Sequence, residues 1–170
     1  MKKLGEEFFH RDCLEVAPDL VGKVIVSRIN GEEVRVRISE TEAYRGEEDT
    51  ACHAHKGRTP RTEVLYGKSG TVYVYLCYGM HWLMNVITGE EGQPQGVLLR
   101  AGVNFNGPAK LTKRLGVTGE QNKTSFVTNP LLWIEDDGFS CGIKTDKRVG
   151  INYATPEYID KKWRFILDEQ

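Results

Sequence analysis

Several features that would place a protein in a common class are missing from this sequence. Its 170 residues contain no apolar run long enough to cross a membrane, and the start, MKKLGEEFFHRD, lacks the apolar region of a signal peptide. There is no internal repeat, no Pro/Gly/Ser-rich linker, no GxxxxGKS/T and no GxGxxG. These absences predict one soluble, intracellular domain over residues 1–170 and disfavour P-loop and dinucleotide-binding proteins.

Cysteine and positive charge are also limited. The four cysteines form no C-x-x-C pair, and a chain of this length does not need disulfides, so we interpret Cys13, Cys52, Cys77 and Cys141 as reduced thiols. The net charge is -1 and the pI is near 6.4, so any binding to a polyanion has to rely on local basic groups. The basic side chains cluster at Lys56, Arg58, Arg61 and Lys68, and again at Lys110, Lys113 and Arg114.

The most distinctive stretch is aromatic. Residues 70–86, GTVYVYLCYGMHWLMNV, hold three of the seven tyrosines, one tryptophan and two of the three methionines. Its first half alternates like a strand, with Tyr73 and Tyr75 on one face and valines on the other. The glycine after Tyr78 allows a sharp turn that projects this ring outward. An aromatic strand is more often part of a core than a ligand platform, so the stretch alone favours a core strand.

A β-hairpin is predicted around Asn30-Gly31, which separates VIVSRI from VRVRIS. In the second strand Val36 and Ile38 share the inward face. If the strand continues through ETEAY, the same alternation places Glu40, Glu42 and Tyr44 on that face, where desolvation raises the pKa of a carboxyl toward that of a useful general base. If the strand ends near residue 39, both glutamates are exposed. The pattern leaves both alternatives open.

An arginine in an apolar segment supplies a partner for such a carboxylate. Arg100 is the single charged residue in GVLLRAGV, a run rich in strand-forming residues. A buried guanidinium needs an anion, and a buried carboxylate needs a cation, so the two compensate each other. We predict that Arg100 pairs with Glu42 or with Glu40.

Residues 45–69 are polar and rich in turn formers, which predicts a long functional loop. Residues 47–49 fit the first turn of a short helix that leads toward Cys52 and His53. Cys52, His53 and His55 also raise the possibility of a zinc site. Because no second ligand pair follows at the spacing of a zinc finger or ribbon, no metal ligand is predicted.

The second half of the chain predicts one more helix and further strands. A short helix opens at Gly107-Pro108 and closes at Gly116, and its N-terminus offers free amides. Strands with turns follow from residue 130, with a helix start at Thr155-Pro156 and a last strand at WRFIL.

Six segments, in order and at suitable spacing, resemble a known family: ETEAY (40–44), His53, GTVYVYLCYGMHWLMN (70–85), VLLRA (97–101), GPAKL (107–111) and RVGI (148–151). They are similar to the alkyladenine, or 3-methyladenine, DNA glycosylases of the mammalian type, which bacteria also have, and not to the helix-hairpin-helix glycosylases. The resemblance covers nearly the whole chain. It implies an α+β fold, a single mixed domain around a curved antiparallel β-sheet with short helices, which agrees with the strand-rich pattern.

The resemblance also implies an activity. It is that of a monofunctional enzyme that flips alkylated or deaminated purines out of duplex DNA and hydrolyses the N-glycosidic bond, which starts base excision repair. The family's purines are 3-methyladenine, 7-methylguanine, hypoxanthine and ethenoadenine. The resemblance implies no metal and no organic cofactor, damaged double-stranded DNA as the partner, a monomer without membrane contact, and a place at the nucleoid in the bacterial cytoplasm. No lysine matches a Schiff-base position, so we expect hydrolysis without strand cleavage.

The catalytic roles that the resemblance implies fall on three residues. Glu42 matches the general base that deprotonates a water attacking C1′. Arg100 would hold that water and balance the carboxylate, and the Val149 carbonyl would accept a hydrogen bond from the water. Tyr78 matches the wedge that fills the gap left by the flipped base, with Met80 packed beside it.

The base-binding roles fall on four more residues. Tyr44 would stack on one side of the flipped base, and His53 with Tyr75 on the other. Asn85 matches the position that excludes guanine by a clash with its 2-amino group. Two rival functions belong to other classes: a lesion-binding module without catalysis, and a zinc hydrolase that uses Cys52 and the two loop histidines.

Overall fold

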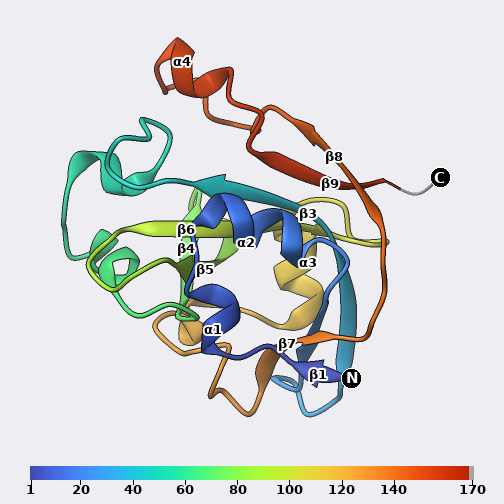
Figure 1. Ribbon diagram of the computed structural model, residues 1–170. Helices are drawn as coiled ribbons and strands as arrows, with labels where there is room; N and C mark the ends of the chain where they lie inside the picture. The colour runs from blue at the N-terminus through green and yellow to red at the C-terminus, as the bar shows by residue number, and fades with distance from the viewer. Residues whose placement is uncertain (169–170) are drawn as a thin grey trace.

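The structure is a computed structural model that describes residues 1–168, and its frame is an antiparallel sheet (Figure 1). The strands in these residues are β1 (Lys2–Lys3), β2 (Val24–Ser27), β3 (Val34–Tyr44), β4 (Val72–Cys77), β5 (His81–Thr88), β6 (Gln95–Gly102), β7 (Leu132–Asp136), β8 (Gly142–Asp146) and β9 (Arg164–Asp168). They lie in the order β1-β7-β2-β3-β6-β5-β4, and β9 pairs with both β3 and β8. The sheet curls into a half-barrel with few helices, so the predicted α+β fold around a curved antiparallel sheet is confirmed.

The helices are short, and the two in the second half of the chain begin at the predicted positions. They are α1 (Glu6–Phe9), α2 (Cys13–Leu20), α3 (Pro108–Leu115) and α4 (Pro156–Ile159), with 3₁₀ turns η1 (His53–Lys56), η2 (Thr62–Tyr66) and η3 (Gly119–Gln121). Pro108 occupies the first turn of α3, and Gly116 ends it at a φ of 75°, which glycine adopts without strain. The helix predicted from Gly107 to Gly116 is therefore confirmed. No helix within residues 1–168 has the length and apolar character needed to cross a membrane.

The two faces of the sheet are buried in different ways. Helices α2 and α3 cover one face, where Val72 and Val74 belong to the main hydrophobic core. Tyr73 lies in a second, smaller cluster with Leu65 of η2, and Tyr75 packs against it. The alternation predicted for β4 is thus confirmed, and its aromatic face is the one that turns away from the main core.

Strand β3 is the centre of the sheet and runs unbroken to Tyr44, so the alternative that it ends near residue 39 is wrong. It pairs with β2 through the predicted hairpin and with β6 along its other edge. The pairing with β6 shifts by one residue at Ser39 and shifts back at Arg100, because each of these residues is an extra one in its own strand.

The bulge at Ser39 corrects the predicted orientation of the ETEAY segment. Ala43 lies in the main core with Val36 and Ile38, and the Thr41 hydroxyl donates to the Ala17 carbonyl of α2 at 2.7 Å. Glu42 therefore points to the opposite face of the sheet from Ile38, although simple alternation places both on one face. Glu42 is nevertheless completely buried, because a second layer of chain covers that face.

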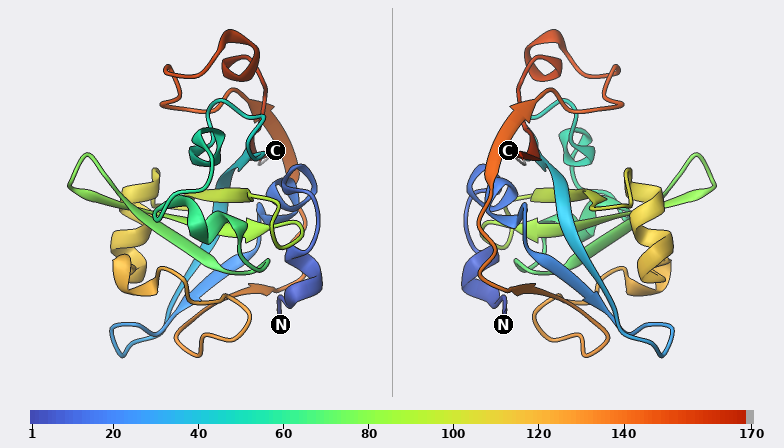
Figure 2. Two further views of the ribbon diagram at one scale, coloured as in Figure 1. Left: turned by 90° about the vertical axis from the view of Figure 1, so that its left-hand side faces the viewer. Right: turned by 90° about the vertical axis from the view of Figure 1, so that its right-hand side faces the viewer.

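The β4–β5 hairpin extends away from the rest of the molecule (Figure 2). Its turn contains Tyr78 at a φ of 53° and Gly79 at a φ of 67°. Positive φ is unusual for a bulky side chain and costs on the order of 1–3 kcal/mol. The side chain at the tip is also almost fully exposed, since Tyr78 keeps 91% of its surface accessible.

Candidate functional site

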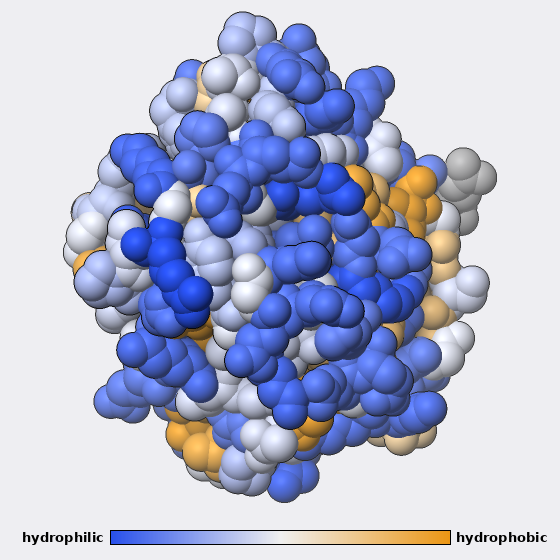
Figure 3. Space-filling view, turned by 60° about the vertical axis from the view of Figure 1, so that its left-hand side comes forward, coloured by the Kyte–Doolittle hydropathy of each residue, from blue (hydrophilic) through white to orange (hydrophobic). Residues whose placement is uncertain are grey.

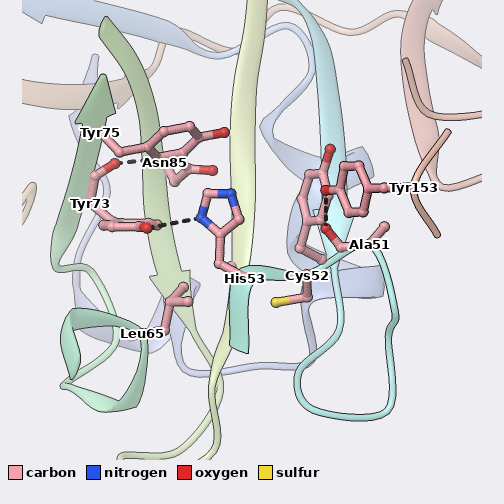
Figure 4. Close-up of a pocket in the computed structure, with 10 residues that line it drawn as sticks. Ala51, Cys52, His53, Leu65, Tyr73, Tyr75, Asn85 and Tyr153 are labelled. Carbon is pink, nitrogen blue, oxygen red and sulfur yellow. Dashed lines mark hydrogen bonds between the residues drawn. The ribbon is translucent and has the colours of Figure 1, made fainter. Parts of the chain in front are cut away.

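A pocket opens on the aromatic face of the sheet, between the strands and the loop that follows β3 (Figure 4). It encloses about 370 Å³, part of it open to solvent. All four residues predicted to bind a base line it: Tyr44, His53, Tyr75 and Asn85. The six other lining residues are Ala51, Cys52, Leu65, Tyr73, Gly96 and Tyr153. The structure therefore brings together residues that are more than 100 positions apart in the sequence.

One wall of the pocket is a cluster of rings around His53. Its imidazole lies with its centre 4.6 Å from the centre of the Tyr75 ring, and its Nδ1 is 2.9 Å from the Tyr73 hydroxyl. Burial, together with the nearby charge of Arg61, lowers the pKa of His53 to about 4. The ring is therefore neutral at physiological pH and presents an uncharged face to a ligand.

Asn85 lies at the floor of the pocket with only 7% of its surface exposed. Its Nδ2 donates a hydrogen bond to the Tyr73 carbonyl at 3.2 Å, which fixes the amide plane. Figure 4 places Asn85 beside Tyr75 and His53, on the side of the pocket away from Tyr153. Because the Asn85 amide is held in position, it can exclude a ligand by a steric clash with any substituent that points at the amide.

Glu42 is a buried carboxylate next to the pocket. Its Oε1 accepts a 2.7 Å hydrogen bond from the Tyr44 hydroxyl, and its Oε2 accepts a 2.8 Å bond from the Val149 amide. Burial raises the pKa of Glu42, and the bonds from Val149 and Tyr44 and the charge of Arg100 oppose this rise. A carboxyl that is buried, yet supported in its ionised form, has the properties of a general base.

Arg100 lies between the two glutamates that the sequence left as alternatives. Its Nε is 3.6 Å from Oε2 of Glu42 and 3.7 Å from Oε1 of Glu40, so it forms ion pairs with both. Glu40 is also hydrogen-bonded to Arg164 of β9 at 2.9 Å. The Nε of Arg100 is buried and has no hydrogen-bond partner within residues 1–168, which leaves one donor directed at this cluster without an acceptor.

Val149 contacts Glu42 through its amide, whereas the sequence prediction concerned its carbonyl. Residues Tyr78 and Met80 lie apart from the pocket, at the exposed tip of the β4–β5 hairpin, where Met80 keeps 71% of its surface accessible. The predicted site residues thus form two groups: a pocket with a buried carboxylate beside it, and two apolar side chains exposed on a projecting turn.

Sequence reasoning missed three residues of the site. Tyr153 lines the pocket and donates a 2.6 Å hydrogen bond to the Ala51 carbonyl, and Figure 4 places it across from His53. Asp49 and Arg148 form a fully buried ion pair under the pocket wall. Asp49 was predicted in the first turn of a short helix that leads toward Cys52 and His53, and this is wrong because the first helical turn after β3 begins at His53. For Arg148, the one signal in the sequence was its position directly before Val149 in the RVGI segment.

The three residues considered for zinc each have a different environment or hydrogen-bond partner. The thiol of Cys52 is buried, which raises its pKa to about 11, and His53 uses Nδ1 toward Tyr73. His55 directs its Nδ1 to the Glu47 carbonyl at 2.7 Å. Within residues 1–168 no three His, Cys, Asp or Glu side chains are grouped as metal ligands.

The face of the molecule shown in Figure 3 is mostly hydrophilic, with apolar residues in small separate patches. Several of the basic side chains singled out by the sequence are paired with acids: Arg58 with Glu63 at 2.6 Å and Lys68 with Glu6 at 3.3 Å. Arg61 instead lies over the Tyr75 ring, 5.2 Å from its centre. The positive charge near the pocket is therefore local and modest.

Comparison with known proteins identifies the class. A family model described as methylpurine-DNA glycosylase matches residues 7–105 and 103–170. The chain is accordingly a DNA glycosylase, a hydrolase of N-glycosyl bonds. It belongs to the methylpurine-DNA glycosylase family, as the resemblance of its sequence segments predicted.

Bacterial relatives cover the full length of the chain. A protein of Desulfitobacterium hafniense is 44% identical over 99% of this chain and 97% of its own length. Proteins of Natranaerobius thermophilus and Rickettsia felis are 40% and 38% identical over 97% and 98% of this chain, and 95% and 93% of their own lengths. All three are provisionally named 3-methyladenine DNA glycosylase.

Proposed function

We propose that this protein flips 3-methyladenine, 7-methylguanine, hypoxanthine and ethenoadenine out of duplex DNA and hydrolyses their N-glycosidic bonds with Glu42 as the general base. The observation that carries the proposal is the buried, hydrogen-bonded carboxylate of Glu42 directly beside a pocket walled by aromatic rings. A flat heterocycle fits such a pocket, and stacking on a ring contributes ~1–3 kcal/mol per base.

The hydrolytic step needs one water near Glu42. Each carboxylate oxygen of Glu42 accepts one hydrogen bond from the protein and retains capacity for another. The unsatisfied Nε of Arg100 lies 3.6 Å from Oε2, a separation that a bridging water fits. The water donates its proton to Glu42 as it attacks C1′, while Arg100 holds it in place and the Val149 carbonyl accepts its second hydrogen. The released base leaves as positive charge develops on the sugar.

The base is recognised by stacking and exclusion. Tyr44 lies on one side of it and His53 with Tyr75 on the other, and an electron-poor alkylated ring gains most from this contact. Asn85 excludes guanine through its 2-amino group. Outside the pocket, Tyr78 enters the minor groove and fills the space of the flipped nucleotide, with Met80 at its side. The protein does this as a monomer in the bacterial cytoplasm, without metal or organic cofactor.

The test is base release from duplexes that each carry one of the four lesions, with Glu42→Gln as the control. The unmodified protein is expected to release base, and Glu42→Gln to lose roughly 100- to 10,000-fold in rate while it still binds the duplex. Binding without any release by the unmodified protein would identify a lesion-binding module instead. Loss of activity in chelator would identify a zinc hydrolase, and a borohydride-trapped adduct with DNA would overturn simple hydrolysis.

A further inference from the structure

The most strongly buried ion pair in residues 1–168 lies outside the proposed catalytic set. The guanidinium of Arg148 donates two hydrogen bonds to Asp49, at 2.6 Å and 3.0 Å, and neither side chain has any exposed surface. A buried charge persists only where it is paired and hydrogen-bonded, and burying such a pair is often no gain in stability. In a DNA-binding protein an arginine would first be assigned to phosphates, but Arg148 is inaccessible to them.

Three contacts of Arg148 lead to the candidate site, while its Nη2 also donates to the Tyr158 carbonyl at 3.2 Å and its guanidinium lies 5.0 Å from the centre of the Trp163 ring. Its Nη1 donates to the Ala43 carbonyl at 2.9 Å, between Glu42 and Tyr44 in the sequence. Its guanidinium carbon lies 4.8 Å from the centre of the Tyr44 ring, on which it packs as a cation. The residue after Arg148 is Val149, whose amide donates to Glu42. The Arg148 side chain thus contacts the backbone next to Glu42 and the ring of Tyr44. Its own peptide leads directly to the Val149 amide that donates to Glu42.

We propose that Arg148, held by Asp49, is a positioning residue for N-glycosyl hydrolysis: it sets the Val149 amide against Glu42 and the Tyr44 ring against the bound base. This inference rests on the proposed roles of Glu42 and Tyr44. It assigns the Asp49–Arg148 pair to catalysis and not to DNA contact. The pair acts through other groups, so its loss misplaces the reacting groups without removing any of them.

The pair also affects the proton affinity of Glu42. The charged and titratable groups that face Glu42 are Tyr44 on its own strand, Tyr75 on β4, Arg100 on β6, Arg148 on the loop after β8 and Tyr153 on the loop before α4; Glu40 and Arg164 lie beyond Arg100. The Val149 bond and the Arg148 charge both lower the pKa of Glu42 from the value that burial would impose. If the loop shifts, this pKa rises, and the base needs a higher pH to become ionised.

The experiment compares Asp49→Asn with a matched control, Asp137→Asn. Asp137 forms the same kind of two-bond pair with Arg37, at 3.1 Å and 2.8 Å, on the loop after β7 and outside the pocket. Base release from methylated duplex DNA is measured under single-turnover conditions from pH 5 to pH 9, and duplex binding is measured separately. Asp49→Asn is expected to lower the rate by up to about 100-fold, with affinity reduced less than about tenfold.

A shift in the pH profile separates positioning from general damage to the fold. The acid limb of the rate is expected to move to higher pH in Asp49→Asn and to stay in place in Asp137→Asn. The Val149 amide proton, followed by NMR, should titrate with Glu42 in the unmodified protein and lose this response in Asp49→Asn. An unchanged rate, or a lower rate with an unchanged acid limb and an unchanged Val149 titration, would overturn the proposal.

A second variant keeps the test valid if Asp49→Asn does not fold. Arg148→Lys retains the charge but not the forked hydrogen bonds, and it is expected to shift the acid limb in the same direction by a smaller amount. If it leaves both the limb and the Val149 titration unchanged, the proposal fails. If instead Glu42→Gln releases base as fast as the unmodified protein, then the proposed role of Glu42 fails, and that outcome is distinguishable because it does not involve the ion pair.

Discussion

The hydroxyl of Tyr44 donates a 2.7 Å hydrogen bond to Oε1 of Glu42, two residues earlier on the same strand. Burial raises the pKa of Tyr44 well above its usual range, and the neighbouring carboxylate raises it further, so the hydroxyl stays protonated and remains a donor. A ring that lines the pocket is thereby tied to the group proposed to activate water. In the proposed mechanism, recognition of the base and activation of the water share one hydrogen bond.

This bond predicts a specific change for Tyr44→Phe. The variant keeps the ring, so its affinity for a lesion duplex should stay within a few-fold of the unmodified protein. Loss of the hydroxyl removes a bond that lowers the pKa of Glu42, so this pKa rises and the acid limb of base release moves to higher pH. Single-turnover rates measured against pH test this. An unmoved limb would show that the hydroxyl does not support the ionised carboxylate.

His53 should make the protein less stable in acid. Burial lowers its pKa from 6.5 to about 4, so the folded state binds fewer protons than the unfolded state between these values. Stability contributed by neutral His53 is therefore present above about pH 6.5 and is lost as the pH falls toward 4. When the pH is lowered from 7 to 4.5, the free energy of unfolding should fall by roughly 1–3 kcal/mol less in His53→Gln than in the unmodified protein.

Urea denaturation at the two pH values measures this difference. Glu42 acts with the opposite sign, because its pKa is raised by burial, but it contributes equally to both proteins and cancels in the comparison. Equal acid losses in the two proteins would contradict a lowered pKa for His53. An NMR titration of the imidazole, with a midpoint near 4, checks the same point directly.

We expect Tyr78 to strengthen DNA binding while it lowers the stability of the fold. Its φ of 53° suits glycine, so Tyr78→Gly is expected to raise the unfolding free energy by about 1 kcal/mol. The same change removes the exposed ring and should weaken binding to a lesion duplex about 5- to 150-fold, the equivalent of ~1–3 kcal/mol of stacking. Tyr78→Phe is the matched control, since it retains the ring and the strained backbone. Unaltered binding by Tyr78→Gly would remove Tyr78 from the DNA contact.

Asn85 should determine which purines are released. Asn85→Ala opens the pocket floor, and we expect the release of unmodified guanine relative to 7-methylguanine to rise by about an order of magnitude. The lost hydrogen bond to the Tyr73 carbonyl should cost about 1 kcal/mol of stability. Chromatography of the bases released from methylated DNA gives the ratio. A constant ratio would mean that another group excludes guanine.

Much of the fold follows from local signals in the sequence. The glycines that bound α3, the Asn-Gly turn between β2 and β3, and the alternation of β4 each reflect a backbone preference that acts over a few residues. The pocket residues were found because the resemblance supplied their roles, whereas the residues alone favoured a core strand for the aromatic stretch. Both readings are in part correct, since Tyr73 is buried and also lines the pocket.

The rest depends on contacts that no short segment reveals. Asp49 and Arg148 stand 99 positions apart, and each alone looks like a surface loop residue. Tyr153 reaches the pocket only because the loop before α4 folds back over residue 51. The bulges at Ser39 and Arg100 have no signature in composition, because a bulge arises from the fit between two strands.

Those two bulges have a consequence for how the chain can change in length. Each one reverses the facing of its own strand, and together they restore the pairing of β3 with β6. Deleting Ser39 would remove the extra residue and its bulge and would leave Glu42 on the pocket side, whereas deleting Thr41 with the bulge retained would turn Glu42 toward α2 and send Ala43 to the pocket side. Substitutions along these strands leave the geometry in place, whereas a one-residue insertion or deletion among the regularly paired residues of either strand inverts the site. Length in β3 and β6 is therefore under a tighter constraint than residue identity.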